Sequence, residues 1–98
     1  MKAAPATTAE TAVARLGALS AELTQHGWKT RLQVAVGHVP CLFVQNPAPG
    51  AAVLAEHIYA APRADAWWFW RSWAEPISDT VAEAASIIVR VLRAAATP

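Results

Sequence analysis

The chain has 98 residues, of which 55% are hydrophobic and 15% charged, and its formal net charge is +1. This length predicts one domain, and the apolar fraction is too high for an intrinsically disordered chain. A charge so close to neutral implies no general attraction to nucleic acid or to an anionic membrane. We expect residues 1–6 to form a disordered tail and residues 7–96 to form a single domain.

The cellular compartment is predicted from the cysteine count and from the absence of long apolar runs. Cys41 is the only cysteine, so no internal disulfide can form and a reducing compartment is favoured. Charged residues interrupt the first 23 positions, and the apolar runs elsewhere are far shorter than the roughly 18 residues of a membrane span. The sequence therefore predicts a soluble cytoplasmic protein without membrane contact.

The first predicted element is an amphipathic helix. Thr7 and Glu10 have the Thr-x-x-Glu spacing of a capping box, which marks a helix start. Gly27 supplies a stop signal at the other end. Apolar residues recur at steps of three and four along the intervening segment, and they are Val13, Leu16, Leu19 and Leu23.

A hairpin is predicted next. Residues 28–36 alternate strictly, with Trp28 and Leu32 facing one side and Lys29 and Arg31 the other, as in a half-buried antiparallel strand. Residues 37–38 form a plausible two-residue turn, in which a glycine takes the positive φ. Residues 39–46 read as the return strand, which the segment NPAPG at 46–50 breaks.

The rest of the chain predicts two more strands and a second helix. Residues 54–60 read as the third strand, although the segment LAEHIY also fits a helical turn. Residues 62–65 read as a turn, and the tryptophan-rich stretch as the fourth strand, ended by Pro76. Ser78 is the predicted cap of the final helix. The expected fold is α+β, a four-stranded antiparallel meander with the N- and C-terminal helices packed on one face.

The stretch WWFWRSW, residues 67–73, contains four of the five tryptophans. Successive side chains of a strand point to opposite faces, so the stretch separates into an odd-numbered and an even-numbered set. Arg71 resists burial unless it is paired, and we therefore place the odd-numbered set on the open face of the sheet, away from the helices. A one-residue shift in register would exchange the two sets.

The open face is thereby predicted to be aromatic and basic, without a carboxylate from the four strands. Large aromatic side chains can also pack within one chain, but the aromatic part of the face could expose roughly 400–600 Å², which is at or above what a soluble monomer usually exposes. We expect a contact surface centred on Trp67, Phe69, Arg71 and Trp73. The residues around this centre are Phe43, Tyr59 and Arg31.

No pattern predicts catalysis, a cofactor or a metal site. The three histidines and Cys41 lack metal-ligand spacing. Glu56 and His57 are adjacent on a predicted strand and so point to opposite faces, which weakens any acid–base–nucleophile set with Cys41. No phosphate-binding glycine loop or nucleophile motif is present. The sequence predicts a protein that is not an enzyme.

The predicted function is a small protein-interaction or regulatory module, either a homodimer or a partner of another protein, which uses the aromatic and basic face. The alternative is a binding module for a small aromatic or sugar ligand, or for single-stranded nucleic acid. Nucleic acid is the less favoured ligand, because only two or three cations are available on the face.

The segment WWFWRSWAEPI, together with AEHIYAAP, resembles a group of small uncharacterised proteins from actinobacteria. The resemblance covers roughly residues 10–95 and implies the same order of helices and strands, but no activity. The arrangement is also somewhat similar to small dimeric chaperones that hold secretion substrates, a likeness of fold that does not fix function.

Overall fold

The computed structural model describes residues 8–35, 37–45, 55–71 and 75–96. The tail expected at 1–6 and the capping residue Thr7 lie outside these ranges. In chain order the elements are α1 (Thr8–Gln25), β1 (Lys29–Gln33), β2 (Cys41–Gln45), β3 (Ala55–Arg63), β4 (Ala66–Arg71), β5 (Glu75–Ser78) and α2 (Val81–Ala96).

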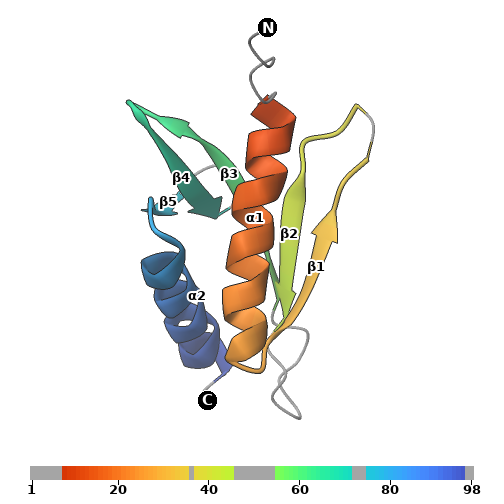
Figure 1. Ribbon diagram of the computed structural model, residues 1–98. Coiled ribbons are helices and arrows are strands. Elements are labelled where there is room, and N and C mark those ends of the chain that lie inside the picture. The colour runs from red at the N-terminus through yellow and green to blue at the C-terminus, as the bar shows by residue number, and fades with distance from the viewer. Residues whose placement is uncertain (1–7, 36, 46–54, 72–74, 97–98) are drawn as a thin grey trace, which may run out of the picture.

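The strands form one antiparallel sheet in the order β1-β2-β3-β4-β5. Both helices lie on the same side of it (Figure 1). The α+β class, the antiparallel pairing and the terminal helices agree with the sequence prediction, but the expected number of four strands is wrong. Pro76, predicted to end the last strand, lies in a fifth strand. This strand is the edge of the sheet, where proline needs no partner for its missing N–H.

The end of α1 has a clear local cause. Gly27 adopts a positive φ of 84°, which costs glycine little because it has no Cβ. The backbone N–H of Trp28 then donates to the carbonyl of Leu23 at 3.1 Å, and that of Gly27 donates to Thr24 at 2.9 Å. These two bonds make a Schellman motif. The motif brings Trp28 back against the buried Leu23 and directs the chain into β1.

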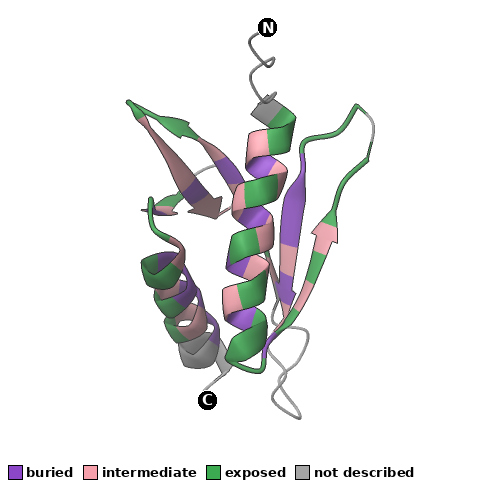
Figure 2. Ribbon diagram, in the orientation of Figure 1, coloured by how far each residue is buried: buried purple, intermediate pink, exposed green. Residues whose placement is uncertain are grey.

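The core lies between the helices and the sheet, as the buried positions in Figure 2 show. The leucine stripe predicted for the first helix is buried, and so are Leu42 and Val44 of β2 and Ile58 of β3. The helix α2 contributes Ala84, Ala85, Ile88 and Leu92 to the same core. Apolar burial of this kind is the main favourable term in folding.

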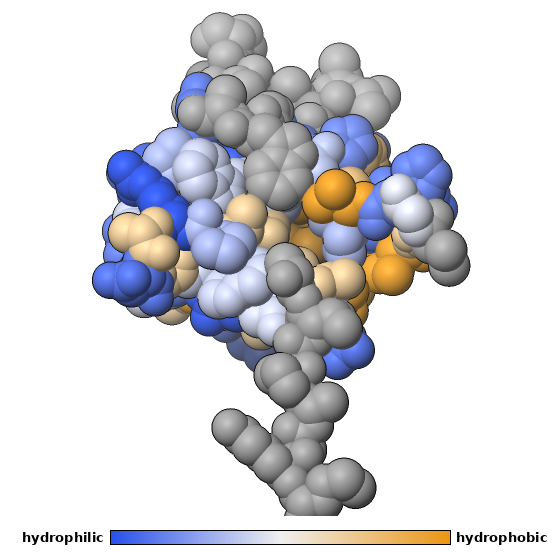
Figure 3. All heavy atoms as spheres, turned by 90° about the horizontal axis from the view of Figure 1, so that it is seen from above, coloured by the Kyte–Doolittle hydropathy of each residue, from blue (hydrophilic) through white to orange (hydrophobic). Residues whose placement is uncertain are grey.

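The connection between β1 and β2 is longer than predicted. The strand β1 ends at Gln33 and β2 begins at Cys41, so the turn is not confined to residues 37–38. Val34, which continues the alternation of Trp28 and Leu32 in the sequence, is 59% exposed, and Val39 is 58% exposed. Figure 3 views the molecule from the end where α1 begins, and hydrophobic atoms gather on the side of this connection.

The start of α2 also differs from the prediction. Ser78 is buried in β5, and Thr80 is the residue that caps the helix, because its Oγ1 accepts a hydrogen bond from the backbone N–H of Glu83 at 3.3 Å. Ser78 supports the turn before the helix by accepting from the N–H of Thr80 at 3.2 Å. The Thr80–Glu83 spacing is that of a capping box.

Candidate interaction surface

The side of the sheet that faces away from both helices is called the open face here (Figure 1). Its members alternate along each strand with the residues that enter the core. They are Lys29, Arg31 and Gln33 of β1, Cys41, Phe43 and Gln45 of β2, His57, Tyr59, Ala61 and Arg63 of β3, and Trp68 and Trp70 of β4.

The predicted orientation of the fourth strand is wrong. Phe69 is fully buried in the core, and Trp67 packs against that core from the helix side. Both were expected on the open face, and neither can form the centre of a contact there. Trp73 lies outside the described residues. The even-numbered tryptophans, Trp68 and Trp70, are the ones on the open face.

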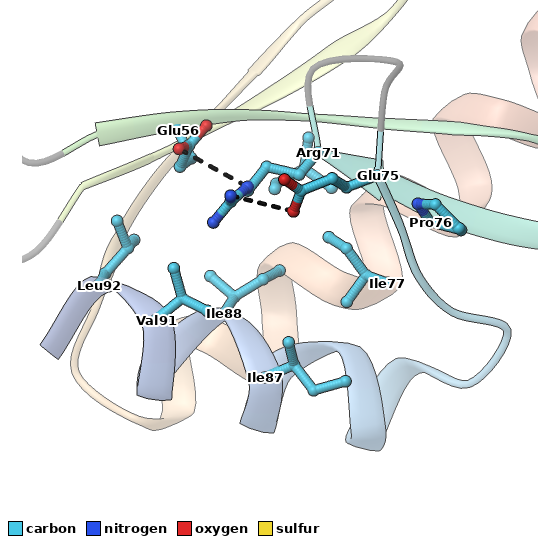
Figure 4. A pocket seen from close by; sticks show the side chains of 10 residues that line it. Glu56, Arg71, Glu75, Pro76, Ile77, Ile87, Ile88, Val91 and Leu92 are labelled. Atoms are coloured by element: carbon cyan, nitrogen blue, oxygen red, sulfur yellow. Dashed lines mark ion pairs between the residues drawn. The ribbon is translucent and has the colours of Figure 1, made fainter. Parts of the chain in front are cut away.

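The prediction placed the odd-numbered residues on the open face because Arg71 is among them. An unpaired arginine would indeed avoid the helix side, but Arg71 is paired there. Its Nη2 lies 3.0 Å from a carboxylate oxygen of Glu75, and its Nε lies 3.9 Å from one of Glu56. Figure 4 shows both carboxylates turned toward the guanidinium, across from the apolar side chains of α2. A glutamate from β3 and one from β5 thus allow Arg71 to face inward.

A second arginine contacts the side of β4 that faces the helices. Arg15 of α1 lies over the ring of Phe69, with 5.0 Å between the guanidinium carbon and the ring centroid. Its Nη2 donates to the backbone carbonyl of Asp79 at 2.6 Å and, more weakly, to that of Trp67 at 3.4 Å. Arg15 therefore connects α1 with β4 and with the segment that leads into α2.

Trp68 and Trp70 are each held by a neighbour on β3. The guanidinium of Arg63 lies over the Trp68 ring, 4.7 Å from its centroid, a cation–π contact. The indole N–H of Trp70 donates to the carbonyl of Ala61 at 3.2 Å. Both rings remain partly exposed. Neither ring was predicted to lie on the open face, although the alternation of the strand contained both as the even-numbered set.

The other predicted site residues lie on the open face. Arg31 is directly opposite Phe43 across the β1–β2 ladder, and Phe43 is opposite His57 across the next. The rings of Phe43 and His57 meet edge to face, with centroids 5.2 Å apart. Tyr59 stands opposite Trp70. The structure thus brings the aromatic residues of β2, β3 and β4 onto one surface.

The charges on the open face are all positive. Lys29, Arg31 and Arg63 lie there, and none of them forms an ion pair with a carboxylate of the described residues. All seven acidic residues of the chain are described, and they lie on the helices, beside Arg71, in the β3–β4 turn or just before α2. The face therefore presents cations and aromatic rings without a negative partner.

Cys41 and Glu56, two members of the acid–base–nucleophile set considered from the sequence, lie on opposite sides of the sheet. Cys41 is buried, and its thiol donates to the side-chain oxygen of Gln33 at 3.4 Å. Burial raises the pKa of this thiol above its ordinary value, which favours the unreactive protonated form. Glu56 lies on the helix side with Arg71, away from Cys41. Among the described residues no group of three or more His, Cys, Asp or Glu could hold a metal ion.

No protein-family model, curated protein or solved structure matches this chain. In the part of the chain that the structure describes, neither helix combines the length and the hydropathy needed to cross a membrane.

Proposed function

We propose that this protein is a small, non-enzymatic interaction module of the cytoplasm, and that it contacts a protein partner through the open face of its sheet. The lone Cys41 fits a reducing compartment. The partner is either another protein or a second copy of this chain.

The observation that carries the proposal is the group of partly exposed aromatic side chains on the open face. Phe43, Tyr59, Trp68 and Trp70 come from three adjacent strands, and both helices lie on the opposite side. Aromatic residues and arginine contribute most of the binding energy at protein interfaces. Rings held by neighbours, as Trp70 is by Ala61, lose less side-chain entropy on binding than mobile ones.

Binding of single-stranded nucleic acid is the second candidate. The observation in its favour is that Lys29 and Arg31 flank Phe43 on the same face. Cations beside stacking rings are the usual means of holding a single strand. A planar aromatic or sugar ligand would use the same rings. Three open-face cations are few for nucleic acid, whose affinity depends on the number of phosphates neutralised.

Site-specific photo-crosslinking tests the proposal. One variant carries p-benzoylphenylalanine in place of Tyr59 on the open face, and the control carries it in place of the exposed Glu83 on α2. Illumination in the cells that make the protein should give an adduct of defined mass from position 59 and none from position 83. An adduct of twice the chain mass would identify a second copy. Identical adducts from both positions, or none from position 59, would contradict the proposal.

A further inference from the structure

The open face has a shallow hollow of about 290 Å³ at its β1 end, lined by Lys29, Thr30, Arg31, Phe43 and Gln45. We propose that this hollow binds carboxylate side chains of an extended acidic segment in the partner protein. This inference rests on the proposed interaction through the open face and specifies the chemistry of the partner.

The donors are placed on one side of the hollow by strand geometry. Lys29 and Arg31 are two residues apart on β1, so both side chains project to the same face, about 7 Å apart along the strand. Directly opposite them on β2 stand Gln45 and Phe43. A carboxylate there would meet an ammonium, a guanidinium and a side-chain amide, with the Phe43 ring beside it. Arginine in particular can hold a carboxylate with two parallel hydrogen bonds.

The two cations have no counter-charge within the described residues. Neither Lys29 nor Arg31 forms an ion pair there, although each is exposed. Like charges at this spacing repel each other, and an anion between them removes that repulsion. Clustered charge of one sign attracts a ligand of the opposite sign, and the segregation therefore points to an anionic ligand.

The position of β1 favours an extended ligand. Among the described strands β1 pairs only with β2, and it is therefore the edge of the sheet. An extended segment that runs along this edge can hydrogen-bond to the backbone of β1. If it alternates acidic residues, its carboxylates all project to the same face, at the same repeat as Lys29 and Arg31.

A second copy of this chain fits the hollow poorly. Two open faces brought together would place Lys29, Arg31 and Arg63 of each copy against a surface without a carboxylate from β1 to β4. Charges of the same sign across an interface are unfavourable. Nucleic acid fits less well than an acidic peptide, because Arg63 already occupies one face of the Trp68 ring and three cations neutralise few phosphates.

The test uses a fluorescein-labelled ten-residue peptide of alternating glutamate and threonine, with binding read by fluorescence anisotropy. The controls are the peptide with glutamine for glutamate, and a ten-nucleotide oligothymidylate. We expect the acidic peptide to bind at least about tenfold more tightly than either control, since charge complementarity is its main difference from the glutamine peptide. Equal binding of the glutamine peptide, or tighter binding of oligothymidylate, would overturn the proposal.

Charge-reversed variants locate the binding. The double variant Lys29→Glu with Arg31→Glu should lower the affinity for the acidic peptide by at least about tenfold. It should bind a lysine–threonine peptide instead. Arg90→Glu, at an exposed position on α2, is the matched control and should change the affinity less than twofold. All three positions are exposed, so folding should persist. Equal losses from both variants would refute the hollow as the site.

The outcome separates this inference from the function on which it rests. If position 59 captures a partner but the glutamate peptide does not bind, the interaction module stands and the carboxylate site is refuted. If light scattering shows a dimer whose formation needs the open face, the acidic partner is likewise refuted. If position 59 captures nothing and the peptide does not bind, both proposals fail.

Discussion

Phe69 and Trp70 are adjacent residues with opposite roles, and a pair of substitutions shows this directly. Phe69 is fully buried, so Phe69→Ala should lower the free energy of unfolding by about 3–5 kcal/mol, through lost transfer energy and a cavity. Trp70 is partly exposed, and Trp70→Ala should cost no more than about 2 kcal/mol. Urea unfolding followed by circular dichroism measures both.

The reverse order of these two costs would mean that β4 presents its odd-numbered residues to the open face, as the sequence analysis expected. The same pair distinguishes folding from binding. Trp70→Ala should weaken partner capture in a protein that remains folded, whereas Phe69→Ala should affect capture only through the loss of folded protein.

Cys41 gives a prediction that depends on pH. Burial raises its pKa in the folded protein above the ordinary value of 9.0, so above that pH the unfolded chain binds fewer protons than the folded one. The free energy of unfolding should therefore be unaffected by Cys41 below about pH 8 and should fall as the pH rises past 9. Compared with Cys41→Ala, the wild-type protein should lose more stability between pH 8 and pH 10.

The reaction of Cys41 with iodoacetamide provides an independent check. The native thiol should react much more slowly than the same thiol in urea, because it is both buried and held protonated. A native rate as high as the rate in urea would show that this part of the open face is not packed as described.

At the scale of an element, the β3–β4 hairpin contains a strained residue. The pair Arg63 and Ala66 closes a two-residue turn, in which Ala64 has a φ of 55°. A left-handed conformation costs an L-residue with a Cβ about 1–2 kcal/mol, whereas glycine adopts it readily. Ala64→Gly should therefore raise the stability by up to about 1 kcal/mol, after the greater chain entropy of glycine is subtracted. Thermal unfolding would detect the change, and a destabilised variant would contradict this turn.

Arg15 is the side chain that ties the elements on the helix side together. It contacts Phe69 of β4 and donates to the carbonyl of Asp79 before α2. Arg15→Met keeps much of the aliphatic packing but removes these donors, and should cost about 2 kcal/mol, the range for hydrogen bonds from charged groups. Arg90→Met, on the exposed side of α2, should cost almost nothing. Similar costs in urea unfolding would argue against the contacts of Arg15.

The elements themselves were largely predictable from local patterns, because each pattern has a local cause. The leucine stripe and Gly27 define α1, and strict alternation defines β1. The face of β4 was not predictable in the same way, since both of its residue sets contain large aromatic rings. What decides the orientation is the pairing of Arg71 with Glu56 and Glu75, and the contact with Glu56 depends on a fold that brings β3 beside β4.

The sequence was sufficient to predict an aromatic and basic face, but not all of the residues that form it. Leu32, Leu42 and Ile58 face the core. Arg31, Phe43 and Tyr59 are their neighbours along the strands, and they therefore lie on the open face. Because β4 has the opposite orientation to the one predicted, its members on the open face are Trp68 and Trp70 and not Trp67 and Phe69. Glu75–Ser78 was missed as a strand because proline usually interrupts a ladder, and only its place at the sheet edge makes Pro76 acceptable.

At the scale of the whole molecule, the near-neutral net charge of +1 conceals an uneven distribution. Carboxylates lie on the helices and near the ends of the later strands, whereas Lys29, Arg31 and Arg63 lie on the open face. Net charge governs general attraction, but a local patch governs the choice and orientation of a partner. The composition alone therefore does not reveal the positive patch on the open face.

An amide NMR titration of the ¹⁵N-labelled protein shows, residue by residue, whether the open face near β1 binds an acidic partner as we propose. With the glutamate–threonine peptide, the largest shift changes should fall on Lys29–Gln33 and on the neighbouring Phe43 and Tyr59. The exposed turns of α2 should change little. Changes concentrated on α1 or α2, with β1 and β2 unaffected, would contradict the account.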